Sequence, residues 1–149
     1  MIDDLLNDLR ADEGWRASIY DDATGEPISK GTVVVGFPTI GYGFMVDAAK
    51  GGELPKSVAD MWLMYAATER WNQLVSKIPW VLEQPENVQR ALGNMSYQLG
   101  VNGVLNFKYM LAALKRSDRD GAAEHALNSR WAEQTKNRAH RIASLIRGD

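Results

Sequence analysis

Apolar side chains recur at a helical period over most of this 149-residue chain. The first such run precedes Gly14, a natural helix terminator, and predicts a helix over residues 1–13. A longer run predicts a helix over residues 57–78, which Pro79 would end. Its apolar positions are Val58, Met61, Trp62, Tyr65, Leu74, Val75 and Ile78. After Pro85 the same period continues and predicts four or five shorter helices.

Residues 15–45 follow a different pattern. Residues 15–20, 32–35 and 39–44 are rich in β-branched and aromatic side chains, and each run is bounded by turn-forming residues. We therefore predict a small antiparallel sheet here, with strands in all three runs. The fold class is α+β and mainly helical.

The chain is long enough for one domain, or for two small lobes that share a helix. We expect a sheet-bearing lobe at about residues 14–56 and a linking helix at about 57–78. A helical lobe would take in residues 79–149 together with the first helix, residues 1–13.

Composition excludes several classes of protein. Apolar residues make up 45% of the chain, which supports a real core. There is no Cys and there are only two His, so we expect no disulfide and no metal site. No apolar run approaches the roughly 20 residues that a membrane span needs, and the acidic N-terminus does not resemble a secretory signal. We expect a soluble protein with no stable membrane insertion.

Charge is distributed unevenly. Residues 1–60 hold 5 Lys and Arg against 11 Asp and Glu, whereas residues 61–149 hold 12 against 8. This pattern suits a cleft with acids on one wall and a polymer-binding surface on the other, but an ordinary solvated surface explains it equally well. Basic residues in the second half are interspersed with acids and form no nucleic-acid-binding motif, so we expect no nucleic-acid partner.

Candidate chemistry lies between Glu13 and Phe44. Glu13 ends the first predicted helix, Asp22 follows nine residues later, and Thr39 opens a glycine-rich segment. Two carboxyl groups can share general acid and base work on a glycosidic bond when one stays protonated and the other ionised. By composition alone Asp21 serves as well as Asp22, and such pairs are common in acidic segments.

Three blocks of sequence resemble the bacteriophage lysozymes of glycoside hydrolase family 24, the T-even phage muramidase type. They are DEGWRASIYDD with TIGYG, then NMSYQLG at residues 94–100, then SRWAEQTKNRAHRI at residues 129–142. They occur in the family's order and cover most of the chain. The resemblance selects Asp22 over Asp21, and it implies the lysozyme-like fold of two lobes joined by a long helix.

The resemblance also implies a reaction. It is hydrolysis of the β-1,4 bond between N-acetylmuramic acid and N-acetylglucosamine in peptidoglycan, without a cofactor. Glu13 would be the general acid, and Asp22 and Thr39 would position and activate the attacking water. That inverting scheme needs carboxyl groups about 6.5–9.5 Å apart, whereas a retaining scheme with Asp22 as nucleophile needs about 5–5.5 Å. Sequence leaves both open.

Further substrate contacts carry over from the same resemblance: Met45, Tyr97, Gln98 and Arg138. Each also has a structural interpretation, in which Tyr97 packs in the core and Arg138 is a surface cation. One departure concerns residues 25–38, a segment longer here than in the T-even type. It should extend a hairpin at the cleft mouth, and it makes Thr24 and Thr32 rival hydroxyls to Thr39.

The sequence therefore predicts a monomeric phage endolysin that acts on peptidoglycan glycan strands. We expect it to stay in the host bacterial cytoplasm until it is released to the cell wall. The alternative is a non-catalytic cell-wall-binding module on the same fold, although both carboxyl residues are present.

Overall fold

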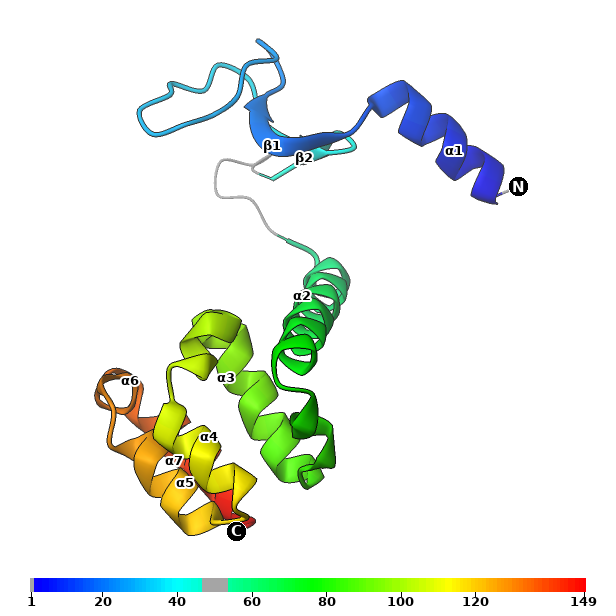
Figure 1. The fold of residues 1–149 in the computed structure, drawn as a ribbon. Helices are drawn as coiled ribbons and strands as arrows, with labels where there is room; N and C mark the ends of the chain where they lie inside the picture. The colour runs from blue at the N-terminus through cyan, green and yellow to red at the C-terminus, as the bar shows by residue number, and fades with distance from the viewer. Residues whose placement is uncertain (1, 47–53) are drawn as a thin grey trace. The chain divides into compact units, whose positions relative to one another are not determined.

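The computed structural model describes residues 2–46 and 54–149, and the chain divides into two compact units, residues 1–59 and 60–149. The first unit holds a helix and a small sheet, and the second is helical (Figure 1). The mainly helical α+β class predicted from the sequence is thus confirmed. The predicted grouping of helix 1–13 with the helical lobe stays a prediction.

The first unit begins with helix α1 (Ile2–Glu13). Asp3 and Asp4 lie in its first turn, where the helix dipole favours negative charge. The helix ends at Gly14, which has φ +67° and donates its N–H to the Arg10 carbonyl at 3.3 Å. Glycine adopts this left-handed conformation without strain, so the sequence fixes Glu13 as the last helical residue.

The sheet has three antiparallel strands in the order β1 (Arg16–Asp21), β2 (Pro38–Gly41) and β3 (Phe44–Met45). β2 is central: Thr39 lies opposite Tyr20 of β1 and opposite Met45 of β3. Pro38 can start this strand because a first position needs no ladder donor. The turn between β2 and β3 contains Gly43, which has φ +71°.

The predicted strand at residues 32–35 is wrong. Thr32 instead closes a turn, in which its N–H donates to the Ser29 carbonyl at 3.0 Å and its hydroxyl accepts from the Ser29 N–H at 3.0 Å. The amide of Val35 donates to a carboxylate rather than to a neighbouring strand. Val33 is 85% exposed, so this β-branched side chain gains no stabilisation from packing against a sheet.

The second unit is built from helices whose positions follow the predicted apolar pattern. They are most of α2 (Lys56–Lys77), the 3-10 helix η1 (Pro79–Glu83), α3 (Glu86–Leu105), α4 (Lys108–Lys115), α5 (Arg119–Leu127), α6 (Arg130–Gln134) and α7 (Lys136–Arg147). α3 is kinked at Gly100, whose φ of 71° and ψ of 164° are not helical. Among the described residues, no helix is long and apolar enough to cross a bilayer.

A single apolar core holds this unit together. α5 packs against α4 and α7, and α7 also packs against α3 (Figure 1). Trp131 of α6 is 6% exposed and meets the Phe107 ring edge to face, with centroids 5.8 Å apart. The largest fully buried side chains of the core are Leu74, Leu92, Met95, Met110, Leu114, Ile146, Val81, Val88 and Val104.

Candidate active site

Glu13 is placed by the end of α1 and by the β2–β3 turn. A Cβ atom at Gly43 would come within 2.7 Å of Glu13 Oε2, so the carboxyl group lies directly against this glycine. The same turn brings aromatic side chains nearby, since the rings of Trp15 and Tyr42 have centroids 5.4 Å apart. The Glu13 side chain itself is exposed. It is therefore accessible to a ligand and adjacent to apolar surface.

Asp22 follows β1 and is bonded twice to Phe37. Its N–H donates to the Phe37 carbonyl at 3.1 Å, and its Oδ1 accepts from the Phe37 N–H at 2.6 Å. The Asp22 side chain is exposed. Among the described residues no hydrogen bond occupies its second oxygen, Oδ2. One carboxylate oxygen is thus fixed and the other faces solvent.

Asp21 differs sharply from its neighbour, although the two residues are chemically identical. Its side chain is only 2% exposed, and its carboxylate accepts three backbone N–H groups. The donors are Val35 at 2.6 Å, Gly36 at 2.9 Å and Ala23 at 3.0 Å. Because this carboxylate is buried and bonded to three backbone amides, it is closed to substrate, and the structure separates a buried acid from an exposed one.

The same amides perturb the titration of Asp21. The Val35 N–H is the largest cause that lowers the pKa of this carboxyl below its usual 3.8, burial opposes it, and the Gly36, Ala23 and Thr24 amides lower it further. Hydrogen bonds from N–H groups favour the ionised form of a carboxyl. Asp21 is therefore an anion at neutral pH and does not supply a proton.

Thr39 lies in the centre of the sheet and is 2% exposed. Its hydroxyl donates to the Phe37 carbonyl at 3.0 Å. Phe37 therefore contacts both predicted partners of the attacking water, through its carbonyl to Thr39 and through its amide to Asp22. The rival hydroxyls are engaged in turns: Thr24 Oγ1 accepts from the Glu26 N–H at 3.3 Å, and Thr32 accepts from Ser29.

Of the three predicted catalytic residues, Thr39 lies in the sheet, whereas Glu13 ends α1 and Asp22 directly follows β1. Asp22 lies at the Phe37 end of β2, Glu13 lies at the Gly43 end, and Thr39 lies between them. Phe37 and Gly43 stand on either side of the central strand β2 (Pro38–Gly41), so the two carboxyl groups contact residues at opposite ends of it.

The predicted substrate contacts lie on different elements. Met45 is in β3, opposite Thr39, and is 53% exposed. Tyr97 on α3 is 44% exposed, so it is not the core residue that its helix face allowed. Gln98 is exposed, but its Oε1 accepts a hydrogen bond from the buried Trp131 Nε1 at 3.0 Å. Gln98 thus has a structural partner, and its amide nitrogen remains for a ligand.

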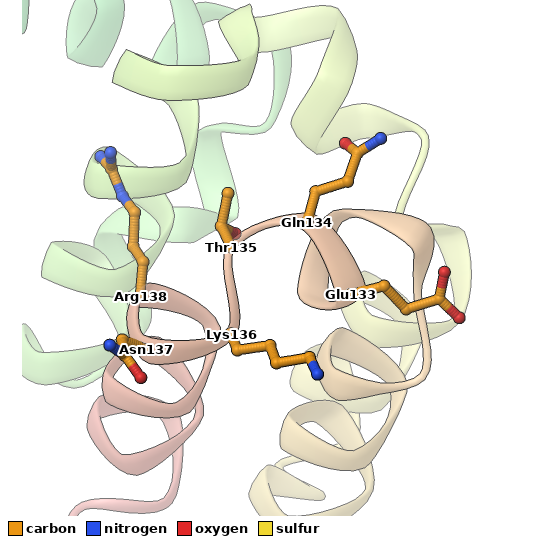
Figure 2. Close-up of a pocket in the computed structure, with 6 residues that line it drawn as sticks. All are labelled: Glu133, Gln134, Thr135, Lys136, Asn137 and Arg138. Carbon is orange, nitrogen blue, oxygen red and sulfur yellow. The ribbon is translucent and has the colours of Figure 1, made fainter.

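Arg138 lies beside a shallow hollow of about 580 Å³ at the junction of α6 and α7. The hollow is lined by the consecutive residues 133–138, and Gln134, Thr135 and Arg138 extend toward the same side of it (Figure 2). Arg138 is bonded to α3, because its Nε donates to Asn94 Oδ1 at 2.9 Å and its Nη2 donates to the Asn94 carbonyl at 3.2 Å. It is therefore a structural link and not a free surface cation.

Comparison with known proteins adds an independent observation. The family described as phage lysozyme matches residues 10–147 of this chain. The chain belongs to the phage lysozyme family. This confirms the resemblance seen in the sequence.

Two relatives illustrate the range of this lysozyme family. The pre-baseplate central spike protein Gp5 of Enterobacteria phage T4 is 30% identical over 163 residues, which cover 93% of this chain and 26% of the spike protein. The probable T4-type lysozyme 1 of Dictyostelium discoideum is 40% identical over 62 residues, which cover 41% of this chain and 36% of that protein. The chain thus spans about a quarter to a third of the length of these two relatives.

The sequence alone did not indicate the roles of Asp21, Gly36 and Phe37. The amides of Gly36 and Phe37 belong to a segment without regular secondary structure, so no hydrophobic pattern in the sequence indicates what they bind. A Cβ at Gly36 would clash with Asp22 Oδ1 and come within 2.7 Å of the Ala23 Cβ. The glycine was visible in the sequence, but its reason, a close approach to Asp22, appears only in the fold.

Proposed function

We propose that this chain is a muramidase that hydrolyses the β-1,4 bond between N-acetylmuramic acid and N-acetylglucosamine in bacterial peptidoglycan. The observation that carries the proposal is that two exposed carboxyl groups contact the residues at either end of β2, Asp22 at Phe37 and Glu13 at Gly43, while the strand itself carries the buried Thr39 hydroxyl. Membership of the phage lysozyme family supports the same substrate class.

Glu13 is the general acid of this proposal. Its exposed carboxyl can reach a glycosidic oxygen, and bound sugar would exclude water from it. Exclusion of water favours the protonated form that an acid catalyst needs near neutral pH. The Trp15 and Tyr42 rings beside the same turn add apolar surface.

Asp22 and Thr39 activate the water. Oδ1 of Asp22 is held by Phe37, which leaves Oδ2 to accept a proton from a water molecule. The Thr39 hydroxyl donates to the Phe37 carbonyl and can accept a hydrogen bond from the same water. The bond to one oxygen orients the carboxylate, and the other oxygen stays available to act as general base.

We infer an inverting outcome. The resemblance to the family supports this, since its scheme has a general acid and a water-activating acid on opposite faces of the sugar. Such a scheme needs carboxyl groups about 6.5–9.5 Å apart with room for a water molecule, whereas a retaining scheme needs about 5–5.5 Å. Proton NMR of the first product tests this directly: the α-anomer supports inversion of the β-bond, and the β-anomer contradicts it.

Met45, Tyr97, Gln98 and Arg138 are the substrate contacts of this proposal. Met45 and Tyr97 offer exposed apolar surface to a sugar ring. The Gln98 amide nitrogen and the Arg138 guanidinium offer donors beyond those already bonded within the protein. Gln98 and Arg138 also make structural hydrogen bonds, so substitution of either would change both stability and binding.

The biological setting we propose is cleavage of the host cell wall by a monomeric phage endolysin, held in the host cytoplasm until release. The match to the T4 spike protein over 93% of this chain favours a second setting, a lysozyme carried on the phage particle. Mass spectrometry of purified particles separates the two, because only the second predicts this protein in every virion.

Purified peptidoglycan provides the test of the activity. The chain should release fragments with new N-acetylmuramic acid reducing ends. Anhydro-muramoyl ends would indicate a lytic transglycosylase instead. Binding to the wall without any new ends would support the non-catalytic wall-binding module.

A further inference from the structure

Asp21 takes no part in the chemistry proposed above, yet its carboxylate is the anchor of a whole segment. Its two oxygens accept the N–H groups of Val35, Gly36 and Ala23 at 2.6 to 3.0 Å. Its backbone adds two bonds across the turn, one to the Glu26 carbonyl and one from the Gly25 N–H. The Asp21 side chain therefore closes residues 22–36 into a loop, because it binds amides near both ends of this segment.

The loop that Asp21 closes ends at the residue that holds Asp22. Val35 and Gly36 bind Asp21, and the next residue, Phe37, donates its N–H to Asp22 Oδ1. Gly36 lies so close to Asp22 that it has no room for a side chain. A displacement of Val35 and Gly36 would thus move the Phe37 amide away from Asp22.

The Asp21 carboxylate is buried, and its hydrogen bonds are to backbone amides. Asp21 is 2% exposed, so water does not compete for its oxygens, whereas Asp22 beside it is open to solvent. Charge-assisted bonds from backbone amides are short and strong, and three of them fix the position of each donor. The Phe37 amide that binds the exposed Asp22 is thereby held by a neighbouring segment that Asp21 fixes in place.

We propose that Asp21 is a positioning residue for Asp22, which binds the Val35 and Gly36 amides and so holds the Phe37 amide against the Asp22 carboxylate. The inference rests on the proposed function, since it assigns Asp21 an effect on catalysis through Asp22. It also gives the long segment 25–38 a task, which is to supply the amides that orient the water-activating acid.

Asp21→Asn tests the inference, because it keeps the shape of the side chain but removes its charge and one acceptor oxygen. Asp8→Asn is the matched control, since Asp8 is an exposed acid on α1. Two quantities are measured on folded protein: kcat and KM on a soluble peptidoglycan fragment, and the ¹⁵N–¹H resonance of the Phe37 amide.

The expected result for Asp21→Asn has two parts. Its kcat falls at least about tenfold with KM within about twofold, because misplacement of a catalytic group by about 1 Å can cost up to about a hundredfold in rate. The Phe37 amide resonance shifts upfield toward its position in Asp22→Asn. Asp8→Asn changes neither quantity.

Any other combination overturns the inference. If kcat falls while the Phe37 resonance stays in place, Asp21 acts by another route, and if the resonance moves while kcat holds, the amide does not matter. Should Asp21→Asn not fold, Asp21→Glu is measured instead, because it keeps the charge but moves the carboxylate away from the Val35 and Gly36 amides, and wild-type kcat there is equally contradictory. If the wild-type protein does not hydrolyse peptidoglycan, the proposed function is refuted. The Phe37 amide resonance would still test whether Asp21 positions that amide against Asp22.

Discussion

The carboxyl group of Glu13 lies against Gly43, at a place where a Cβ atom would come within 2.7 Å of Oε2. Gly43 also has φ +71°, a conformation that other residues adopt at a cost. One glycine thus satisfies two requirements, the tight turn between β2 and β3 and the space for the proposed general acid.

Gly43→Ala should therefore impair catalysis more than stability. The added methyl group would displace the Glu13 carboxyl, and we expect kcat to fall about tenfold to a hundredfold. Backbone strain at positive φ should lower the free energy of unfolding by about 1–2 kcal/mol. Initial rates of reducing-end release and urea denaturation measure the two effects.

Gly31→Ala is the control for that variant. Gly31 has φ +91°, and a Cβ there would meet no atom within 4 Å. It should show the same loss of stability with near wild-type kcat. Equal losses of kcat in both variants would show that strain, and not the contact with Glu13, explains the effect.

The pH dependence of stability should reveal Asp21. Its pKa in the folded chain is lowered, chiefly by the Val35 amide, so protonation costs more in the folded state than in the unfolded state. Its contribution to stability is complete above about pH 5 and is lost as the pH falls through 3.8 and below. Urea denaturation between pH 6 and pH 3 should therefore show a shallower acid loss in Asp21→Asn than in wild type. Parallel curves would contradict the assignment, and Asp8→Asn should follow wild type.

Gln98 should matter to stability as well as to substrate. Its Oε1 satisfies the indole N–H of Trp131, which is 6% exposed. Gln98→Leu would leave that donor unpaired, at a cost of about 1–3 kcal/mol. The exposed neighbour provides a control, since Tyr97→Phe should change stability by less than about 0.5 kcal/mol. Similar midpoints of thermal unfolding for both variants would refute the bond's importance.

Arg138 should not be replaceable by lysine. The guanidinium spans the Asn94 side chain and carbonyl, two acceptors that a single ammonium group cannot reach in the same geometry. We expect Arg138→Lys to lower stability by about 0.5–1.5 kcal/mol. Arg141→Lys, at an exposed position of the same helix, should be neutral. A neutral Arg138→Lys in the same assay would argue against the link.

Most elements could be predicted from the sequence because each has its own local cause. Gly14 ends α1, Pro79 follows α2, and Gly100 kinks α3, and all three act through backbone conformation that the residue type dictates. The strand at residues 32–35 could not be rejected in this way. Its β-branched run satisfies the local rule, and only the distant carboxylate of Asp21 shows where its amides go.

The candidate site was predictable to a similar degree. Resemblance to the family singled out Asp22, and the structure supplies a physical difference that composition does not contain: Asp21 is buried and bonded, whereas Asp22 is exposed. Spacing placed Glu13 and Thr39 on the right elements. It could not show that Phe37 contacts both Thr39 and Asp22, since those bonds depend on how the long segment folds back.

The rate of reducing-end release from purified peptidoglycan by Glu13→Gln tests the central claim most directly. The substitution keeps the size of the side chain but removes its transferable proton, and loss of a general acid costs about a hundredfold to ten-thousandfold. We predict a loss of at least about a hundredfold for Glu13→Gln, and wild-type rates for Glu124→Gln, an exposed control on α5. Wild-type activity in folded Glu13→Gln would contradict the account.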